Sequence, residues 1–296
     1  MNQVSATVID NELILQGIER PHARTILSVR YLWLRCPEIA FVATPGQFVM
    51  VKCGPECTLA RPLSIHAVRG EAIALYFNVL EDGKGTGWLA QRKVDERVEL
   101  YGPLGNGFQI DADAFNLLLV AGGIGIAPLR FLAQEALRGG RTVTLLVGAQ
   151  TATQLYPDNL LPSGITGLAV TTEDGSAGKK GMVTSLLPDF VGWADQVFAC
   201  GPMPMYHDMA TKYGQLLKDK PVQVSLEVRM GCGLGFCYAC TVKTKIGLKQ
   251  VCKDGPVFNL DDILPKIVIR RPKCHPRESG DPGEEWKSGF SGQARE

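Results

Sequence analysis

The first part of the chain contains short runs of apolar and β-branched residues that turn residues separate. Such runs occur at positions 25–34, 47–51, 72–79 and 97–101, with Pro or Gly between them. Regular short strands broken by turns are typical of an antiparallel barrel or sandwich. We therefore expect an N-terminal antiparallel β-barrel domain over residues 1–110.

From about position 111 the pattern changes to continuous apolar runs. These runs lie at 116–121, 142–148, 167–172 and 196–199, and helical patterns at 129–137 and 182–187 lie between them. Continuous apolar strands that alternate with helices indicate a parallel sheet whose two faces are both covered. The pattern predicts a Rossmann-like parallel α/β domain over residues 111–221.

A small third segment follows, which begins with an apolar run at 222–228 and contains four closely spaced cysteines. We expect it to form a separate cluster-binding domain over residues 222–269. Residues 270–296 are charged, contain Gly and Pro, and are poor in aliphatic side chains. Because such a composition cannot bury enough apolar surface to order the chain, a disordered tail is expected there.

The composition is that of an ordinary globular protein, with 45% hydrophobic and 21% charged residues in a chain of 296. Lys and Arg together number 31 against 30 Asp and Glu, so no net field attracts nucleic acid or an anionic membrane. No apolar run is long enough to cross a bilayer. The first residues lack the basic start and apolar block of a secretory signal. We expect a cytoplasmic protein that binds neither nucleic acid nor a membrane.

Four of the nine cysteines are clustered near the C-terminal end of the chain. Cys232, Cys237, Cys240 and Cys252 have the spacing C-x4-C-x2-C-x11-C. Cytoplasmic thiols are kept reduced, so a clustered set indicates metal ligands rather than disulfides. A two-iron two-sulfur (2Fe-2S) cluster needs four thiolates, and this spacing with a distant fourth cysteine is typical of plant-type ferredoxins.

Glycines at 231, 233 and 235 alternate with the first of these cysteines. They let a loop turn sharply around a cluster and direct backbone N–H groups at sulfur. The alternative is a structural zinc site, which would make this segment a binding module without a redox role. Zinc modules usually present two close cysteine pairs, however, and here only Cys237 and Cys240 form one.

Two short motifs of the β-rich part suit a flavin dinucleotide. They are Arg61-Pro62-Leu63-Ser64 and the pair Gly85-Thr86. A pyrophosphate group needs a cation and free backbone N–H groups, and an isoalloxazine ring needs a nearby hydroxyl or amide. Arg61 would supply the cation, Ser64 the hydroxyl, and Gly85-Thr86 the amides. Taken singly, an Arg-Pro near a strand is usually a solvated strand edge, and a Gly-Lys-Gly-Thr-Gly segment is usually a turn.

A glycine-rich loop follows the first strand of the predicted α/β domain. Gly122-Gly123-Ile124-Gly125 leads from that strand into a helix with Pro128 in its first turn. Glycines let a phosphate approach the backbone at a helix N-terminus, so we expect a phosphate-binding loop. The loop departs from the usual G-x-G-x-x-G pattern. In addition, Gly148-Ala149-Gln150-Thr151 stands where an acidic residue normally follows the second strand, and no Arg or Lys there favours NADP.

The turn Cys200-Gly201-Pro202 ends a later strand, at the carboxyl edge where open α/β sheets bind ligands. Cys200 would contact a nicotinamide ring there, or it would be a buried packing residue. The other cysteines, at 36, 53, 57 and 274, have no partners at metal-binding spacing, and packing roles are expected for them.

With these motifs in this order, residues 4–269 resemble the electron-transfer subunits of NAD-dependent (class 1B) dihydroorotate dehydrogenase, within the ferredoxin–NADP reductase superfamily. The resemblance implies that FAD is bound by Arg61, Pro62, Leu63, Ser64, Gly85 and Thr86, with further contacts from Asn78, Val79 and Leu80. It implies an NAD site formed by Gly122, Gly123, Gly125, Cys200, Gly201 and Pro202, and a 2Fe-2S cluster on Cys232, Cys237, Cys240 and Cys252. Glu227 lies in a segment that the family shares near the flavin, whereas Phe236 and Tyr238 are bulkier than the residues often found there.

The resemblance also implies a partner and a reaction. The partner is an FMN-containing catalytic subunit that oxidises dihydroorotate to orotate, in a heterotetramer of two copies of each chain. Electrons would pass one at a time from FMN through the cluster to FAD, which reduces NAD+ in pyrimidine (UMP) biosynthesis. No side chain of this chain would act as a nucleophile or general base. Similar flavin and iron–sulfur subunits of sulfide dehydrogenase-like, hydrogenase-associated and NADH-dependent ferredoxin:NADP oxidoreductase complexes remain alternatives.

Overall fold

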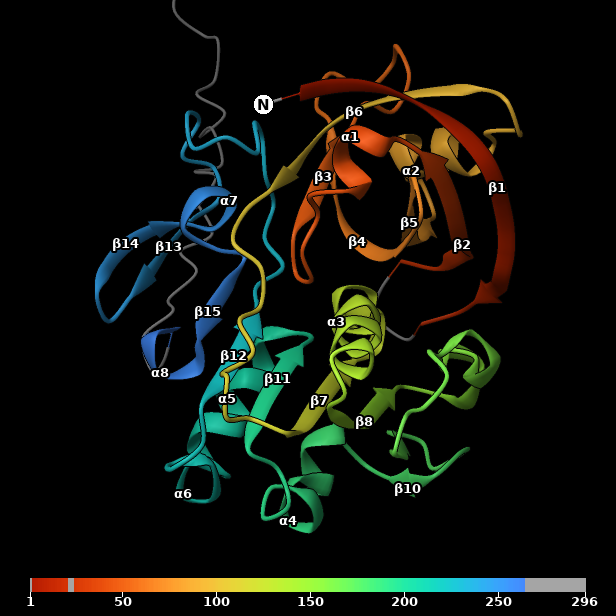
Figure 1. Cartoon of the computed structure of the whole chain (residues 1–296). Coiled ribbons are helices and arrows are strands. Elements are labelled where there is room, and N and C mark those ends of the chain that lie inside the picture. The colour runs from red at the N-terminus through yellow and green to blue at the C-terminus, as the bar shows by residue number, and fades with distance from the viewer. Residues whose placement is uncertain (1, 21–23, 264–296) are drawn as a thin grey trace, which may run out of the picture.

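Six strands of the N-terminal part close into an antiparallel barrel in the order β1-β2-β5-β4-β3-β6 (Figure 1). The computed structural model describes residues 2–20 and 24–263. The barrel strands are β1 (Asn2–Ile18), β2 (Ile26–Arg35), β3 (Phe48–Val51), β4 (Arg61–Arg69), β5 (Ala72–Leu80) and β6 (Arg97–Leu104), with helices α1 (Pro37–Ala40) and α2 (Lys84–Ala90) between them. Antiparallel pairing of β1 with β6 completes the barrel and leaves no free sheet edge. The predicted β-barrel is confirmed.

Alternate side chains of these strands fill the interior of the barrel. Leu32, Leu75 and Leu100 come from three different strands, and each has no solvent exposure. Along a strand, successive side chains point to opposite faces, so one face of each strand supplies this core. Apolar side chains on the other face are free to pack against the second part of the molecule.

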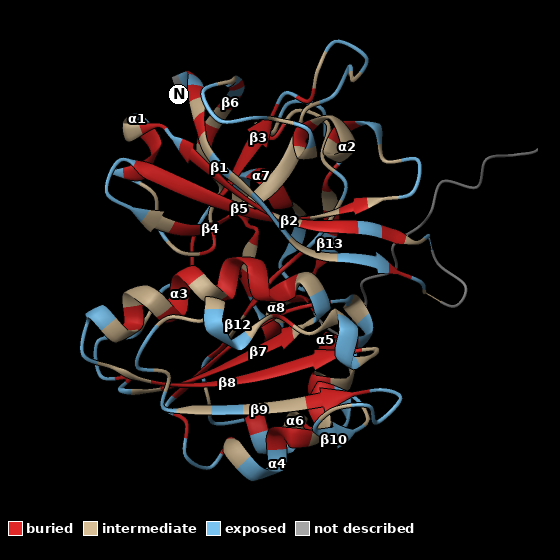
Figure 2. Ribbon diagram, turned by 90° about the vertical axis from the view of Figure 1, so that its right-hand side faces the viewer, coloured by how far each residue is buried: buried red, intermediate tan, exposed pale blue. Residues whose placement is uncertain are grey.

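A seven-stranded sheet forms the second part, in the order β10-β9-β8-β7-β11-β12-β15. Its strands are β7 (Asn116–Gly122), β8 (Thr142–Ala149), β9 (Gly167–Thr172), β10 (Lys179–Lys180), β11 (Gln196–Cys200), β12 (Val222–Ser225) and β15 (Val257–Asn259). All neighbouring strands are parallel except β15, which runs antiparallel to β12. The predicted parallel α/β sheet is confirmed, and its central strands are buried along most of their length (Figure 2).

Helices and short 3-10 segments connect these strands. They are η1 (Gly123–Gly125), α3 (Ile126–Arg138), η2 (Ala152–Gln154), η3 (Asp158–Leu160), η4 (Val183–Leu186), α4 (Leu187–Phe190), α5 (Met203–Thr211), α6 (Gly214–Leu217) and α8 (Leu260–Ile263). The helix expected at 129–137 is α3, which begins three residues earlier. The one expected at 182–187 is instead the 3-10 segment η4 followed by α4, and Val183 of η4 packs closely on Gly148 at the end of β8. None of the described helices combines the length and the apolar character that crossing a membrane requires.

The cysteine-containing segment projects from the sheet between β12 and β15 (Figure 1). It contains a two-stranded hairpin, β13 (Thr241–Thr244) and β14 (Gly247–Gln250), followed by α7 (Val251–Asp254). Because β12 and β15 both belong to the large sheet, that sheet extends across the boundary expected at residue 221. The domain limits 1–110, 111–221 and 222–269 stay predictions, and the tail expected at 270–296 lies outside the described residues.

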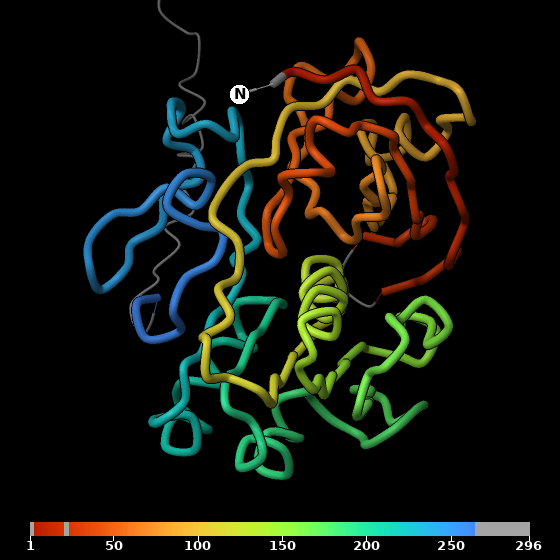
Figure 3. Tube along the Cα trace, viewed as in Figure 1, coloured from red at the N-terminus to blue at the C-terminus, as the bar shows by residue number. Residues whose placement is uncertain are grey.

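Helix α3 lies between the barrel and the sheet (Figure 3). At its start, Nδ1 of the buried His66 from β4 lies 2.8 Å from the carbonyl oxygen of Ala127. The other ring nitrogen of His66 lies 3.0 Å from the hydroxyl of Tyr156, and Tyr76 stacks on the imidazole. This shared aromatic core holds the barrel at a fixed position relative to the carboxyl edge of the sheet.

Candidate functional site

The four clustered cysteines come together in two pairs. The Sγ atoms of Cys240 and Cys252 lie 3.3 Å apart, and both side chains are buried. The thiols of Cys232 and Cys237 also interact with each other, and Cys237 is the exposed member of the set. Within the described residues, no three His, Cys, Asp or Glu side chains converge on a position for a single metal ion. Two adjacent pairs are what a two-iron cluster requires, because each iron takes two thiolates.

Backbone N–H groups of the loop point at these sulfur atoms. Leu234 N donates to Sγ of Cys232 over 3.3 Å, and Gly235 N donates to Sγ of Cys252 over 3.1 Å. Burial raises the pKa of the Cys232 thiol, but several such N–H donors, that of Leu234 foremost, outweigh burial and lower the pKa to about 6. Burial and the nearby Cys240 thiol raise the pKa of Cys252 to about 12, so a thiolate there needs a bound cation. The donor set therefore fits an iron–sulfur cluster.

Two barrel strands support the cluster loop. Gly233 and Gly235 have φ values of +73° and +82°, which side chains rarely tolerate. A Cβ atom on Gly233 would lie 2.6 Å from Cγ of Met50 in β3. From β6, the Tyr101 hydroxyl donates to the carbonyl oxygen of Cys232 over 3.0 Å. The expected need for glycine thus has two causes, the left-handed backbone and the close approach to the barrel.

The two flavin motifs meet at one end of the barrel. Arg61 begins β4, and Gly85 lies in the first turn of α2. A Cβ atom on Gly85 would lie 2.8 Å from Nε of Arg61, so only glycine leaves room for this guanidinium. Nη1 of Arg61 donates to the carbonyl oxygen of Leu59 over 2.6 Å, which orients the side chain. The structure thereby brings a cation next to the free backbone amides of a helix start.

The remaining residues of these motifs lie on neighbouring barrel strands. Pro62 and Ser64 pair with Met50 and Phe48 of β3, and Ser64 is half-buried. Asn78, Val79 and Leu80 form the end of β5, and Asn78 reaches the cavity described next. The segment Arg61–Ser64 therefore lies in the strand next to that of Met50, and Met50 contacts the cluster loop.

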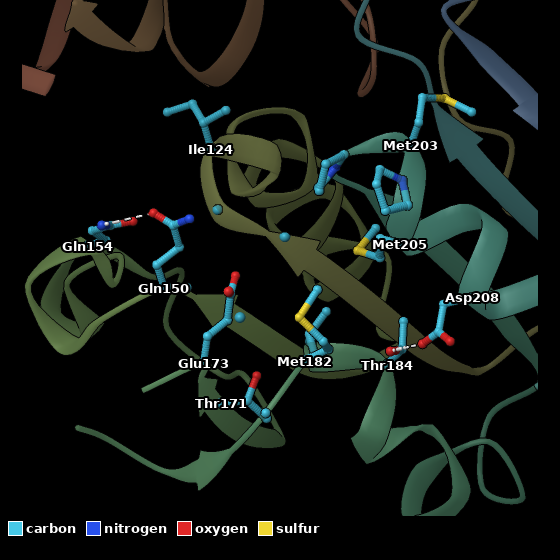
Figure 4. Close-up of a pocket in the computed structure, with 18 of the residues that line it drawn as sticks. Ile124, Gln150, Gln154, Thr171, Glu173, Met182, Thr184, Met203, Met205 and Asp208 are labelled. Carbon is cyan, nitrogen blue, oxygen red and sulfur yellow. Dashed lines mark hydrogen bonds between the residues drawn. The ribbon is translucent and has the colours of Figure 1, made fainter. Parts of the chain in front are cut away.

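A cavity of about 1140 Å3 lies at the carboxyl edge of the sheet (Figure 4). Its wall contains residues at the ends of four adjacent strands: Gly122 and Gly123 at the end of β7, Gln150 after β8, Glu173 after β9, and Pro202 after β11. Asn78 of the barrel and Glu227, which follows β12, close the cavity on the barrel side. Of the nucleotide-binding residues expected from the sequence, Asn78, Gly122, Gly123 and Pro202 line this cavity.

Cys200 does not line the cavity. It has 1% exposure, and its Sγ lies 3.7 Å from the carbonyl oxygen of Ser225 on β12. Burial raises the pKa of the Cys200 thiol well above its ordinary value. A Cβ atom on Gly125 would lie only 2.0 Å from the carbonyl oxygen of Cys200. The expected residues Gly125 and Cys200 therefore meet directly behind the cavity wall, where they hold the loop against β11.

Glu227 faces the cavity from the barrel side. Its side chain is open to the cavity, while protein atoms surround it on the other sides, and this desolvation raises the pKa of its carboxyl group. Both Glu227 and Asn78 line the cavity, and the position of Glu227 near a flavin stays a prediction.

Several residues that line the cavity carry no motif that the sequence made visible. They are Gln154, Glu173, Met182, Thr184, Met203, Met205 and Asp208 (Figure 4). Glu173 could have been found, because it directly follows the predicted strand at 167–172 and ligands bind at the carboxyl ends of such strands. The methionines gave no signal, since Met is an ordinary core residue.

Residues 227–264 match the family model described as the iron–sulfur cluster binding domain of dihydroorotate dehydrogenase B. The chain is 40% identical over 238 residues to the dihydroorotate dehydrogenase B (NAD(+)) electron transfer subunit of Desulforamulus reducens, an alignment that covers 77% of this chain and 89% of the relative. It is 38% identical over 231 residues to the subunit of the same name from Bacillus caldolyticus, with coverages of 74% and 86%.

Two solved structures with a similar fold are reductases of the ferredoxin type. An NADH-dependent reduced ferredoxin-NADP oxidoreductase, described for flavin-based electron bifurcation, superposes with a TM-score of 0.74 at 28% identity, covering 88% of this chain and 89% of that one. The ferredoxin reductase of carbazole 1,9a-dioxygenase gives a TM-score of 0.61 at 18% identity, with coverages of 75% and 68%. This second likeness concerns the fold alone.

Proposed function

The chain belongs to the family of electron-transfer subunits of NAD-dependent dihydroorotate dehydrogenase B, and we propose that it carries electrons from an FMN-containing catalytic subunit to NAD+. The observation that supports this most strongly is the position of the cluster loop on the barrel. Gly233 of the loop packs on Met50, and Met50 pairs with Pro62 in the adjacent flavin motif. When bound, the 2Fe-2S cluster supplies one-electron transfer, and FAD supplies the change to two-electron transfer that NAD+ needs.

The proposed cluster ligands are Cys232, Cys237, Cys240 and Cys252. Their arrangement in two pairs favours two iron atoms, with Cys232 and Cys237 on one and Cys240 and Cys252 on the other. A zinc site would instead need all four sulfur atoms around a single ion. The N–H groups of Leu234 and Gly235 would stabilise negative charge on sulfur and so influence the reduction potential.

The proposed FAD-binding residues belong to the barrel and to α2. They are Arg61, Pro62, Leu63, Ser64, Asn78, Val79, Leu80, Gly85 and Thr86. Arg61 would hold the pyrophosphate by charge-assisted hydrogen bonds, with the amides at the start of α2 on the same group. The space that Gly85 leaves beside the guanidinium supports this assignment.

For NAD we propose the cavity at the carboxyl edge of the sheet. Gly122, Gly123 and Pro202 would contact the nucleotide directly, because they line the wall. Gly125, Cys200 and Gly201 would act through the backbone, by holding the loop and β11 in contact. Nicotinamide would lie toward Asn78 and Glu227, on the side where the barrel holds the flavin.

We propose that the catalytic partner docks over Cys237. This ligand is exposed, and Phe236 and Tyr238 beside it are 78% and 69% exposed. Leu248 of the hairpin that follows the loop is 73% exposed as well. Exposed apolar groups of this kind are typical of a surface that a partner covers. Covering it would also shorten the path for electrons from FMN.

The assembly proposed from the family is a heterotetramer of two subunits of each kind. A cytoplasmic location belongs to the same proposal. It is supported by the cysteines of the described residues, none of which is paired in a disulfide, since that compartment keeps thiols reduced.

A second candidate is an NADH-dependent ferredoxin:NADP oxidoreductase subunit. The structural likeness to such an enzyme at a TM-score of 0.74 favours it, although the identity of 28% is lower than the 40% shared with the dihydroorotate dehydrogenase subunits. The two candidates differ in the partner rather than in this chain's fold.

Coexpression of the chain with the candidate catalytic subunit tests the proposal. A stable complex should contain FMN and FAD and should form NADH when dihydroorotate is added. Copurification with a ferredoxin-dependent enzyme, without any turnover of dihydroorotate, would favour the second candidate instead. The catalytic subunit alone is the control, and it should oxidise dihydroorotate with an artificial acceptor but not with NAD+.

A further inference from the structure

A buried histidine of the barrel contacts two segments that flank the nucleotide cavity. Nδ1 of His66 lies 2.8 Å from the carbonyl oxygen of Ala127, in the first turn of α3 and directly after the glycine-rich loop. Its Nε2 lies 3.0 Å from the hydroxyl of Tyr156, in the β8–β9 segment, residues 150–166, which connects these two strands. Gln150 and Gln154 of the same segment line the cavity (Figure 4). One barrel side chain therefore bridges the start of α3 and the β8–β9 segment.

The hydrogen atoms of this bridge have one arrangement. A carbonyl oxygen only accepts hydrogen bonds, so Nδ1 of His66 carries the hydrogen that it donates to Ala127. Burial, and then the charge of Arg130, lower the pKa of His66, so the imidazole is neutral and Nε2 carries no hydrogen. The hydroxyl of Tyr156 therefore donates to Nε2.

The carbonyl oxygen of Leu160 is a second acceptor, 3.2 Å from the same hydroxyl. The hydroxyl has one hydrogen, and giving it to Leu160 would leave the buried Nε2 of His66 without a donor. The Leu160 oxygen does not need this hydrogen, because Nε of Arg130 donates to it over 2.8 Å. Both acceptors are satisfied only when Tyr156 donates to His66.

Aromatic rings hold the imidazole and the phenol in this orientation. Tyr76 stacks on His66 with ring centroids 5.0 Å apart, and Tyr156 meets Tyr76 edge to face at 5.1 Å. Tyr31 meets the imidazole edge to face, also at 5.1 Å, and its buried hydroxyl has no hydrogen-bond partner among the described residues. The two tyrosines that touch His66 through their edges thus differ in one respect, since Tyr156 makes a hydrogen bond and Tyr31 makes none.

The β8–β9 segment depends on this bond more than α3 does. Helix α3 has a second bond to the barrel, because Nε2 of Gln134 donates to the carbonyl oxygen of Val68 in β4 over 2.9 Å. Within the part of the chain that the structure describes, Tyr156 makes the only hydrogen bond from the β8–β9 segment to the barrel. Its loss would release the segment while α3 stays attached.

We propose that the hydrogen bond from Tyr156 to His66 sets the position of the β8–β9 segment in the nucleotide cavity. Neither side chain lines the cavity, so both are positioning residues, which act through Gln150 and Gln154. This inference rests on the proposed function, which places NAD in this cavity.

The position of the segment determines which kinetic constant the bond affects. The strand order puts β8 on one side of β7, and Glu227 follows β12 on the other side. Nicotinamide lies toward Asn78 and Glu227 in the proposed site, so the β8–β9 segment faces the far half of the nucleotide. The bond therefore affects how tightly the nucleotide binds and leaves hydride transfer itself unchanged.

Steady-state reduction of a dye by NADH, measured on the intact complex with its FAD content known, tests this inference. Y156F removes the donor and should raise KM for NADH by about 3- to 10-fold, while kcat changes by less than about twofold. Y31F is the matched control, since it removes a hydroxyl from the same aromatic cluster that makes no hydrogen bond. It should leave both constants unchanged.

A second variant, H66N, tests the same bond from the barrel. The shorter Asn amide keeps a donor for the carbonyl oxygen of Ala127 and does not reach Tyr156. H66N should raise KM as Y156F does, and the double variant should raise it no further, because each change removes the same bond.

A wild-type KM in the Y156F or H66N complex would overturn the inference, while the proposed nucleotide site would stand. Effects that multiply in the double variant, or an equal rise of KM in Y31F, would also overturn it, because they indicate general loosening of the aromatic cluster. If the wild-type complex neither reduces the dye with NADH nor binds NAD+, the proposed site itself is wrong, and the role of Tyr156 falls with it.

Discussion

The Sγ atoms of Cys240 and Cys252 lie 3.3 Å apart because the hairpin of β13 and β14 fills the sequence between them. Thr241 pairs with Gln250 at the base of this hairpin, and Val251 N donates to the carbonyl oxygen of Cys240 over 3.2 Å. The eleven residues between the last two cysteines therefore correspond to one complete hairpin and the first residue of α7. A shorter or longer insertion would separate the two thiols unless it preserved the pairing at the base.

Replacing Cys237 by Ser should interrupt electron transfer between the subunits. We expect dihydroorotate-dependent NAD+ reduction to fall to less than about one hundredth, because a cluster ligand is lost. NADH-dependent reduction of a dye should persist, since it needs only FAD and the nucleotide cavity. Both rates are measured by absorbance on the purified complex. Cys36→Ala, which changes a buried thiol of the barrel, is the control, and full turnover of the Cys237→Ser complex would contradict the proposed relay.

Replacing Arg61 by Ala should weaken FAD binding by about 10- to 100-fold, because a charge-assisted contact to the pyrophosphate is removed. Flavin retained after gel filtration, quantified by absorbance, reports the change. Arg97→Ala serves as the matched control, since Arg97 is an exposed arginine of β6 outside the flavin motifs. Unchanged flavin content in the Arg61→Ala protein would contradict the proposed role of this side chain.

Replacing Gly125 by Ala should lower the free energy of unfolding by about 1–3 kcal/mol, since the new Cβ would lie 2.0 Å from the carbonyl oxygen of Cys200. The backbone of β11 must move to relieve this contact, because a carbonyl group cannot rotate away as a side chain does. Urea unfolding followed by circular dichroism measures the difference. Gly214→Ala should change stability little, because nothing lies within 4 Å of a Cβ atom there.

The buried His66 should make the protein less stable in acid. Burial, and then the charge of Arg130, lower the pKa of His66 to about 3, against an ordinary value of about 6.5 in the unfolded chain. Between these values the unfolded state binds a proton that the folded state does not, so stability falls as the pH drops from about 6.5 toward 3. His66→Gln should lower the number of protons taken up on unfolding by up to about one. The slope of the unfolding free energy against pH, from urea unfolding at several pH values, measures this number. If the His66→Gln protein has the same slope as the wild type, the imidazole is not neutral and buried. His207→Gln, on the exposed face of α5, is the control.

The features that could be predicted correctly depend on residues that are close together in the sequence. The cysteine spacing, the glycines of the cluster loop and the apolar runs that became β7, β8 and β9 are local patterns, and the structure has them where they were expected. The antiparallel barrel was also predicted from a local pattern, the alternation of short strands and turns. The closure of the barrel depends on pairing between distant strands.

The parts that the sequence did not predict depend on pairing between distant segments. Cys200 is buried because β12 pairs with β11, and nothing near Cys200 in the sequence shows this. Likewise, β15 joins the large sheet after the entire cluster segment, so a boundary drawn from composition could not anticipate it. Glu173 and Gln150 line the same cavity because β9 pairs with β8 in the sheet.

The metal and flavin content of the chain, purified without oxygen, is the sharpest test of the cluster beside a bound flavin. We expect about two iron atoms and two acid-labile sulfides per chain, together with one FAD, and a visible spectrum that combines flavin bands with broad cluster absorption. A colourless protein that contains zinc, or no metal at all, would contradict it.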